Sequence, residues 1–359
     1  MVDGSRPERT ERPRSAEELA ELLRSAAEAG QAVIPVGGGR AIGLGDPPER
    51  FDLALETGGL DRIIEYSQAD MTASVEAGVT LEELNAELGR AGQFLPLDPF
   101  NAPGHTVGGA LAAGVSGPLR LRFGTPRDFV IGLRVALPDG RLVSSGGRVV
   151  KNVSGYDMNK LHLGALGSLG VIVAASFKVF PKPLDEVTLE TQAEDLEAAL
   201  AEARRALGLA MAPIALELTS DHRLLARLAG TEGGVRRIAR ELGWKEADAD
   251  CWEAHARLRP AARISVPPDY LPALLAELTP GTRWWASPGV GVAYLAEPDV
   301  AQRAAAESVG GSLVLFDGSS ELKRGQGAWG KPPATLDVMR RIRDAFDPGR
   351  TLSPGRFVV

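Results

Sequence analysis

Hydrophobic and polar positions alternate along most of the chain at spacings typical of short helices and strands. Ser15 and Glu18 form a capping-box pattern, and leucines and alanines then recur at helical spacing up to Gly30. An apolar run over 33–36 follows and breaks into consecutive glycines. The opening unit is therefore predicted to be a helix, a strand and a glycine-rich loop at the carboxyl end of the strand, a common location for a ligand.

The loop over 37–45 contains Gly37-Gly38-Gly39-Arg40, then Ile42, Gly43 and Gly45. Consecutive glycines can aim successive N–H groups into one concavity that binds a phosphate. A dinucleotide fingerprint would need a third glycine where Ile42 stands, and no Gly-Lys-Ser/Thr follows for a P-loop. The pattern alone leaves a phosphate cradle and a plain glycine-rich turn open.

Two further glycine-rich stretches follow in the first half of the chain. One runs over 94–117 and contains Thr106-Val107-Gly108-Gly109, followed by alanines that predict either close approach of a ligand or a helix packed tightly on a sheet. The other holds Gly164, Gly167 and Gly170 before an apolar strand over 171–179. Three such stretches, each beside a strand, indicate one extended ligand.

Pro181-Lys182-Pro183 marks a domain boundary, because two prolines interrupt regular structure and the composition changes afterwards. The later region alternates strand and helix patterns, which favours an antiparallel or mixed sheet covered on one face. We expect a flexible leader over 1–14, a first domain over 15–183, a second over 184–335, and a helix and tail over 336–359 that return to the first domain.

Composition narrows the possible functions. A chain of 359 residues can form two domains, and its net charge of −7 without a long basic run argues against nucleic-acid binding. The single cysteine, Cys251, excludes an internal disulfide, a four-cysteine iron–sulfur cluster and a four-cysteine zinc site. The four histidines lack metal-ligand spacing, and no run is long enough to span a membrane, so we expect no metal and a cytoplasmic location.

Four segments together resemble the FAD-binding domain of the vanillyl-alcohol oxidase and p-cresol methylhydroxylase (PCMH) family. They are 35–43, 106–109, Lys151-Asn152-Val153-Ser154-Gly155-Tyr156-Asp157, and 164–172. The resemblance implies an α+β fold, with a two-part PCMH-type FAD-binding domain followed by a mixed α/β cap-like domain whose sheet is covered by helices. Within this family the chain is most similar to the FAD-binding subunits of bacterial glycolate oxidases, through Gly117-Pro118, 127–130, Asp347-Pro348 and Pro354-Gly355-Arg356.

The resemblance implies which residues hold FAD. The first loop would wrap the pyrophosphate, the second stretch would line the flavin side, and the third would flank the adenosine end or the pyrophosphate. The implied cofactor-binding residues are Val36, Gly37, Gly38, Gly39, Arg40, Ala41, Ile42, Pro96, Leu97, Thr106, Val107, Gly108, Gly109, Ala112, Ala113, Ser116, Gly117, Gly167, Gly170, Val171 and Ile172.

Some relatives attach FAD covalently through a histidine in the first loop. That loop has no histidine here, so we expect noncovalent FAD, with His105 as a neighbour of the flavin rather than a reacting group. The histidine-rich substrate motif of the related catalytic subunits is absent, and the catalytic residues remain unknown. Arg120 and Arg122 could place a cation beside the flavin or bind a partner, whereas Asp128, Tyr156 and Asp157 are expected to be structural.

Three functions remain open from the sequence. The first is the FAD-binding subunit of a multi-subunit glycolate oxidase that oxidises a small 2-hydroxy acid, with a second flavoprotein subunit and an iron–sulfur subunit as partners that could also bring the chain to a membrane. The second is an autonomous FAD-dependent 2-hydroxy-acid dehydrogenase whose base is His222, His255 or Tyr294. The third is a scaffold whose FAD is purely structural.

Overall fold

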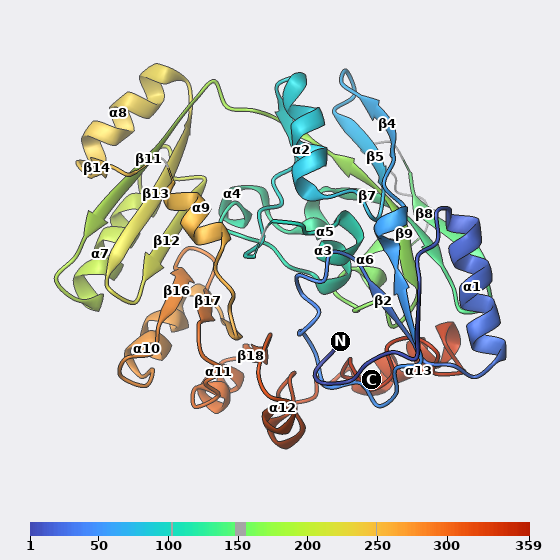
Figure 1. Cartoon of the computed structure of the whole chain (residues 1–359). Coiled ribbons are helices and arrows are strands. Elements are labelled where there is room, and N and C mark those ends of the chain that lie inside the picture. Colours follow the sequence, from blue (N-terminus) through green and yellow to red (C-terminus); the bar gives the residue numbers. More distant parts are fainter. Residues whose placement is uncertain (102, 148–155, 249) are drawn as a thin grey trace.

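The computed structural model describes residues 1–101, 103–147, 156–248 and 250–359, so residues 151–155 of the third family segment lie outside the described residues. Two large sheets dominate the molecule, one built from the first half of the chain and one from the second (Figure 1). Loops from the first half and the segment after the last strand lie between them. This arrangement of mixed helices and sheets confirms the predicted α+β fold class.

The first half begins with a small parallel sheet in the order β1-β3-β2, formed by β1 (Arg9–Glu11), β3 (Leu53–Glu56) and β2 (Val33–Val36). Helix α1 (Ala16–Glu28) begins at Ser15, whose side chain accepts a hydrogen bond from the Glu18 N–H, as the capping pattern predicts. The apolar face of α1 packs with β2 and β3 in one core. Strand β2 is thereby held rigidly where it enters the glycine loop.

The second part of this half is a five-stranded antiparallel sheet in the order β4-β5-β9-β7-β8. Its strands are β4 (Ile63–Ser67), β5 (Thr72–Glu76), β9 (Val171–Lys178), β7 (Val130–Ala136) and β8 (Leu142–Gly146). Around it lie η1 (Thr57–Gly59), α2 (Leu81–Arg90), β6 (Gln93–Phe94), α3 (Val107–Ala113), α4 (Arg120–Phe123), α5 (Pro126–Phe129), α6 (Asn159–His162) and β10 (Phe180–Pro181).

The second half forms an eight-stranded antiparallel sheet in the order β14-β11-β13-β12-β16-β17-β15-β18. The strands are β11 (Asp185–Gln192), β12 (Ala215–Thr219), β13 (Arg223–Gly230), β14 (Lys245–Glu246), β15 (Ala262–Ser265), β16 (Trp284–Ser287), β17 (Val292–Leu295) and β18 (Ser312–Leu315). The helical elements are α7 (Leu196–Leu207), α8 (Glu232–Leu242), α9 (Cys251–Ala256), η2 (Pro268–Tyr270), α10 (Leu271–Ala276), α11 (Arg303–Ser308) and α12 (Ser320–Gln326).

Alternation along these strands gives the sheet two different faces. Ile264 of β15 and Leu313 of β18 point into the core with α7, α8, α10 and α11. Their neighbours in sequence, Arg263 and Val314, point to the opposite face, as does Tyr294 of β17, which pairs with Arg263. These three side chains line cavities shared with loops of the first half. One face of the sheet therefore packs against the helices, and the other face carries polar side chains toward the first half.

Residues 1–14 are not the free leader that their charged composition predicts. Strand β1 pairs in parallel with the edge of β3, and the Val2 side chain is almost fully buried. The pairing is decided by the backbone hydrogen-bonding groups of β3, which a pattern of charged side chains does not reveal. The first residues are thus part of the packed structure beside the glycine loop.

Helix α13 (Leu336–Phe346) and the tail after it lie against the first half. The Val33 N–H donates to the Thr351 carbonyl at 2.7 Å, and the Ser353 N–H donates to the Val33 carbonyl at 2.8 Å. The tail therefore runs beside β2, the strand that leads into the glycine loop.

Candidate functional site

The glycine loop after β2 packs against the loop before α3 at distances that exclude side chains. A Cβ atom on Gly38 would lie 1.8 Å from the Gly104 carbonyl oxygen, and one on Gly37 would lie 2.3 Å from the Thr106 hydroxyl oxygen. Gly39 instead has open space around it but a φ of +71°, which favours glycine. The glycines are needed here for two different physical reasons, close approach and backbone conformation.

The same loop leaves backbone donors free. The Gly38 N–H donates to the Thr106 hydroxyl at 3.2 Å, whereas the N–H groups of Gly39, Arg40 and Ala41 donate to no atom of the described chain. Backbone N–H groups are normally paired, and adjacent unpaired ones at a concave surface form an anion-binding nest. The loop therefore has the geometry of a phosphate cradle rather than of a plain turn.

Helix α3 forms the opposite wall of this nest. Thr106 caps α3, and a Cβ atom on Gly108 would lie 2.7 Å from the Ala77 Cβ atom, so the helix packs very closely beside β5. On its other side Ala112 and Ala113 line a cavity. Both interpretations of the small residues hold, because they allow tight packing on one side and leave room on the other.

These walls enclose a first cleft. Most of the residues that the family resemblance implied line it: Gly37, Gly38, Gly39, Arg40, Ala41, Ile42, Thr106, Gly108, Gly109, Ala112, Ala113, Gly167, Val171 and Ile172. It is also lined by residues that were not in the predicted set: Ile34, Pro35, Thr57, His105, Leu166 and Arg356. Segments far apart in the sequence thus meet around one cavity.

Seven implied residues lie outside the lining of the first cleft. Val107 is fully buried in the core with Leu97, and a Cβ atom on Gly170 would lie 2.5 Å from Val135, so these positions serve packing. Gly117 is similarly close to the Asp98 carbonyl. The others are Ser116, which lines a second cleft, and Val36 and Pro96, which line none of the clefts described here.

The second cleft, of about 1300 Å³, continues from the first, with which it shares 39–42 and His105. Phe100 and Ser116 line it from the first half, whereas Tyr294 and Phe316 line it from the second sheet. The Tyr294 hydroxyl donates to the Ser116 carbonyl at 3.2 Å. The two halves of the molecule therefore build this cavity jointly.

A third cleft of about 1310 Å³ is lined by four cationic side chains, those of Arg120, Arg127, Arg263 and Lys331, and by no described carboxylate. It shares Ser116 with the second cleft and Ala113 with the first. Neither Arg120 nor Arg263 forms an ion pair with another described residue, and burial lowers the pKa of Arg263. An anionic group would supply the missing countercharge.

His105 lies at the junction of the first and second clefts. Its side chain is buried, with Nε2 at 3.2 Å from the Phe100 carbonyl oxygen, and burial lowers its pKa to about 4. The imidazole is therefore neutral near pH 7. It fits the predicted role of a neighbour of the ligand better than that of a cation or a strong base.

Of the three candidate bases, only Tyr294 lines one of these clefts. His255 is buried with Nε2 at 3.5 Å from Glu217, and His222 lies in the turn between β12 and β13. Burial raises the pKa of Tyr294, so its hydroxyl remains protonated near neutral pH and acts as a hydrogen-bond donor. We therefore assign no catalytic base.

The remaining predicted residues lie away from the clefts. Asp128 caps α5 through the Thr125 N–H, Asp157 pairs with Lys160 at 3.2 Å, and Tyr156 is 94% exposed. Arg122 is exposed, and the lining of the three clefts does not include it. Among the described residues there is no cluster of three or more potential metal ligands, and none of their helices is long and apolar enough to cross a membrane.

Comparison with known proteins identifies FAD as the nucleotide that the first half binds. Residues 7–146 match the family model described as FAD binding domain. Glycolate oxidase subunit GlcE of Escherichia coli (strain K12) is 35% identical over 192 residues, 53% of this chain and 54% of that protein. Glycolate oxidase subunit GlcD of Bacillus subtilis (strain 168) is 31% identical over 221 residues, 62% of this chain and 47% of that protein.

A protein named D-lactate dehydrogenase (cytochrome), mitochondrial, of Arabidopsis thaliana is 36% identical over 175 residues, 49% of this chain and 30% of that protein. These matches span about half or less of the relatives' length. A solved structure of alkyldihydroxyacetonephosphate synthase superimposes with a TM-score of 0.66 over 97% of this chain and 77% of that chain at 18% identity, which shows a shared fold.

Proposed function

From an FAD-binding domain over residues 7–146, of the type found in glycolate oxidase subunits, we propose that this chain takes part in the oxidation of glycolate or a similar small 2-hydroxy acid. The observation that carries the proposal is the continuity of the clefts. A nest of free N–H groups for a diphosphate opens into a cavity between the two sheets, and that cavity adjoins a cleft lined by arginines.

The residues of the first cleft fit FAD. The N–H groups of 39–41 would hold its pyrophosphate, because they are unpaired and no side chain covers them. Residues around His105, Ala112 and Ala113 would then line the path toward the flavin ring, in the direction of the second cleft. With no histidine in the loop over 37–45, the cofactor would be held noncovalently.

Bound FAD supplies the two-electron acceptor for the hydride that leaves C2 of a 2-hydroxy acid, while the hydroxyl proton goes to a base. The chain's own contribution would be to bind and orient the acid. Arg263 and Arg120 can pair with its carboxylate, since guanidinium groups match carboxylate geometry. The Tyr294 hydroxyl, which donates to the Ser116 carbonyl, lines the adjoining second cleft.

We propose that the chain works with a second flavoprotein subunit and an iron–sulfur subunit, which receives the electrons. The names of the two glycolate oxidase relatives include the word subunit, and Cys251 alone is too few cysteines for a cluster in this chain. The unassigned base agrees with chemistry completed by a partner. The autonomous dehydrogenase is the second candidate, favoured by Arg263 and Tyr294 in adjoining clefts of the same chain.

The first experiment is the visible spectrum of the chain purified alone, followed by anaerobic addition of glycolate or D-lactate. We expect the spectrum of one bound flavin per chain. Acid precipitation should release this flavin, because FAD is held noncovalently. Flavin that stays oxidised until the partner subunits are added supports the proposal that the chain is one subunit of a larger oxidase. Flavin that bleaches at once supports the autonomous enzyme, and a chain that binds no FAD even when reconstituted contradicts the proposed function.

A further inference from the structure

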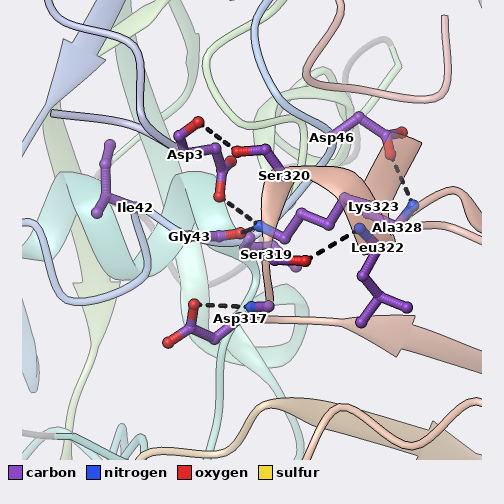
Figure 2. Close-up of polar contacts among 12 residues, drawn as sticks. Asp3, Ile42, Gly43, Asp46, Asp317, Ser319, Ser320, Leu322, Lys323 and Ala328 are labelled. Carbon is purple, nitrogen blue, oxygen red and sulfur yellow. Dashed lines mark hydrogen bonds and ion pairs between the residues drawn. The ribbon is translucent and has the colours of Figure 1, made fainter. Parts of the chain in front are cut away.

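A lysine ammonium group is completely buried beneath the glycine loop. Lys323 of α12 has no exposed surface, and its Nζ donates to the Asp3 carboxylate at 2.8 Å and to the Gly43 carbonyl (Figure 2). Asp3 comes from the first residues, Gly43 from the loop that cradles the ligand, and Lys323 from the segment after β18. Three distant parts of the chain therefore meet at one ammonium group.

This arrangement is costly unless the charge has a specific task. Burying an ion pair costs more in desolvation than it commonly returns, and an apolar side chain of similar volume is often equally stable. Helix α12 keeps its other long polar side chains, Glu321 and Arg324, exposed to water. A charge at position 323 is therefore not needed for the helix itself, and its specific contacts must account for it.

A second buried cation contacts the same loop. Arg356 donates through Nη2 to the carbonyls of Ile42 and Leu44, and its Nη1 lies 3.8 Å from the Asp3 carboxylate. Arg356 and Lys323 together bind three successive carbonyls of the loop. In a planar trans peptide the C=O and N–H point in opposite directions, so anchoring a carbonyl fixes the orientation of its whole peptide. The anchored peptides directly follow the N–H groups of 39–41, which donate to no described atom, and therefore fix the direction in which the loop leaves them.

Helix α12 also continues directly from the wall of the second cleft. Residues 317–320 line that cleft, and the Ser320 hydroxyl donates to the Asp3 carbonyl. At the other end of the helix, the Ala328 N–H donates to the Asp46 carboxylate at 2.7 Å (Figure 2). Helix α12 is thus fastened at its start to the first residues of the chain and just beyond its end to Asp46, which directly follows the glycine loop.

We propose that Lys323 is a positioning residue of the cofactor cleft, which holds the phosphate-binding loop in its binding geometry through Gly43 and is itself paired with Asp3. This inference rests on the placement of FAD proposed above. Lys323 does not itself line the first cleft, so its effect on affinity would pass through the loop backbone.

The test compares FAD dissociation constants of apo-protein, measured by flavin fluorescence quenching well below each variant's unfolding temperature. Lys323→Met removes the ammonium and keeps most of the volume, and we expect about a tenfold or greater loss of FAD affinity. Arg324→Met makes the same chemical change on the exposed face of α12 and should bind FAD like the unaltered chain.

The double variant Asp3→Asn/Lys323→Met separates positioning from simple stability. Because Asp3 also lies 3.8 Å from Arg356, removing the carboxylate leaves that buried cation without its countercharge, so the thermal midpoint of the apo-protein should fall further than in Lys323→Met. FAD affinity should remain low, because the contact to Gly43 is still missing. Affinity that recovers in the double variant, or that never falls in the single one, overturns the proposal. Failure of the unaltered chain to bind FAD would instead contradict the proposed function.

Discussion

At the residue scale, Gly38 shows how one missing side chain defines the first cleft. A Cβ atom there would overlap the Gly104 carbonyl oxygen at 1.8 Å, and backbone cannot yield as a flexible side chain can. We expect Gly38→Ala to displace the loop before α3 and to lower FAD affinity by about tenfold or more. Gly233→Ala, in open space on α8, is the matched control, and equal FAD affinity of both variants would contradict the argument.

His105 gives a prediction about pH. Burial lowers its folded pKa to about 4, below the ordinary value of 6.5, so the unfolded state binds a proton that the folded state does not. The same holds for His162, whereas burial raises the pKa of Asp98 to about 7 and acts in the opposite direction. From these groups, the free energy of unfolding should fall as the pH drops from about 6.5 to about 4.

In His105→Gln one such proton is removed, and the pH dependence should be shallower by about one proton in that window. Urea unfolding at several pH values measures this slope. An unchanged slope would show that His105 does not contribute.

The residues of the first cleft could be predicted wherever a local motif carried them. Gly37 and Thr106 stand in segments whose glycine pattern or family resemblance is visible in the sequence. Leu166 and Arg356 stand in segments that carry the resemblance but had no predicted role, and Thr57 reaches the same cavity through tertiary packing that no spacing along the chain indicates. Conversely, Val107 and Gly170 belong to the family segments but serve packing, since a motif does not tell which face of an element meets the ligand.

At the scale of elements, β15 places Arg263 on the face of the sheet that meets the first half. Because Arg263 has no carboxylate partner among the described residues, Arg263→Met should leave FAD content unchanged and weaken the proposed oxidation of a 2-hydroxy acid by about tenfold to a hundredfold, mainly through KM. Steady-state kinetics with the proposed partner subunits present measures this. Arg283→Met, which removes an exposed arginine paired with Glu297, should change little, and a similar loss in both variants would contradict the assignment.

The capping pattern at Ser15 predicted α1, and the alternation of strand and helix patterns after residue 183 predicted an antiparallel or mixed sheet in the second half. They did not predict β1, whose sequence Arg-Thr-Glu lacks any apolar signal and whose pairing depends on the free edge of β3. They also did not reveal that Arg263 and Tyr294 would meet the loops of the first half, since strand order within a sheet is set by tertiary packing.

At the scale of the whole molecule, the second and third clefts are lined by residues from both halves of the chain. The two large sheets lie on opposite sides of the molecule (Figure 1). The fold class followed from the resemblance and is confirmed by the superposition with alkyldihydroxyacetonephosphate synthase. The domain division at 183 remains a prediction. The contribution of the first residues and of the segment after β18 to one buried cluster was not predictable, because it joins Asp3 to Lys323 across nearly the entire chain.

The contact of the tail with the glycine loop has a consequence for the time course of biosynthesis. Ile42 and Arg356, which share a hydrogen bond, are separated by 314 positions. At about 5 to 20 residues per second, a ribosome needs roughly 15 to 60 seconds to extend the chain from one to the other. Throughout that interval the nascent glycine loop lacks its tail contacts, so the cleft can be completed, and FAD captured in it, only after residue 356 has left the exit tunnel.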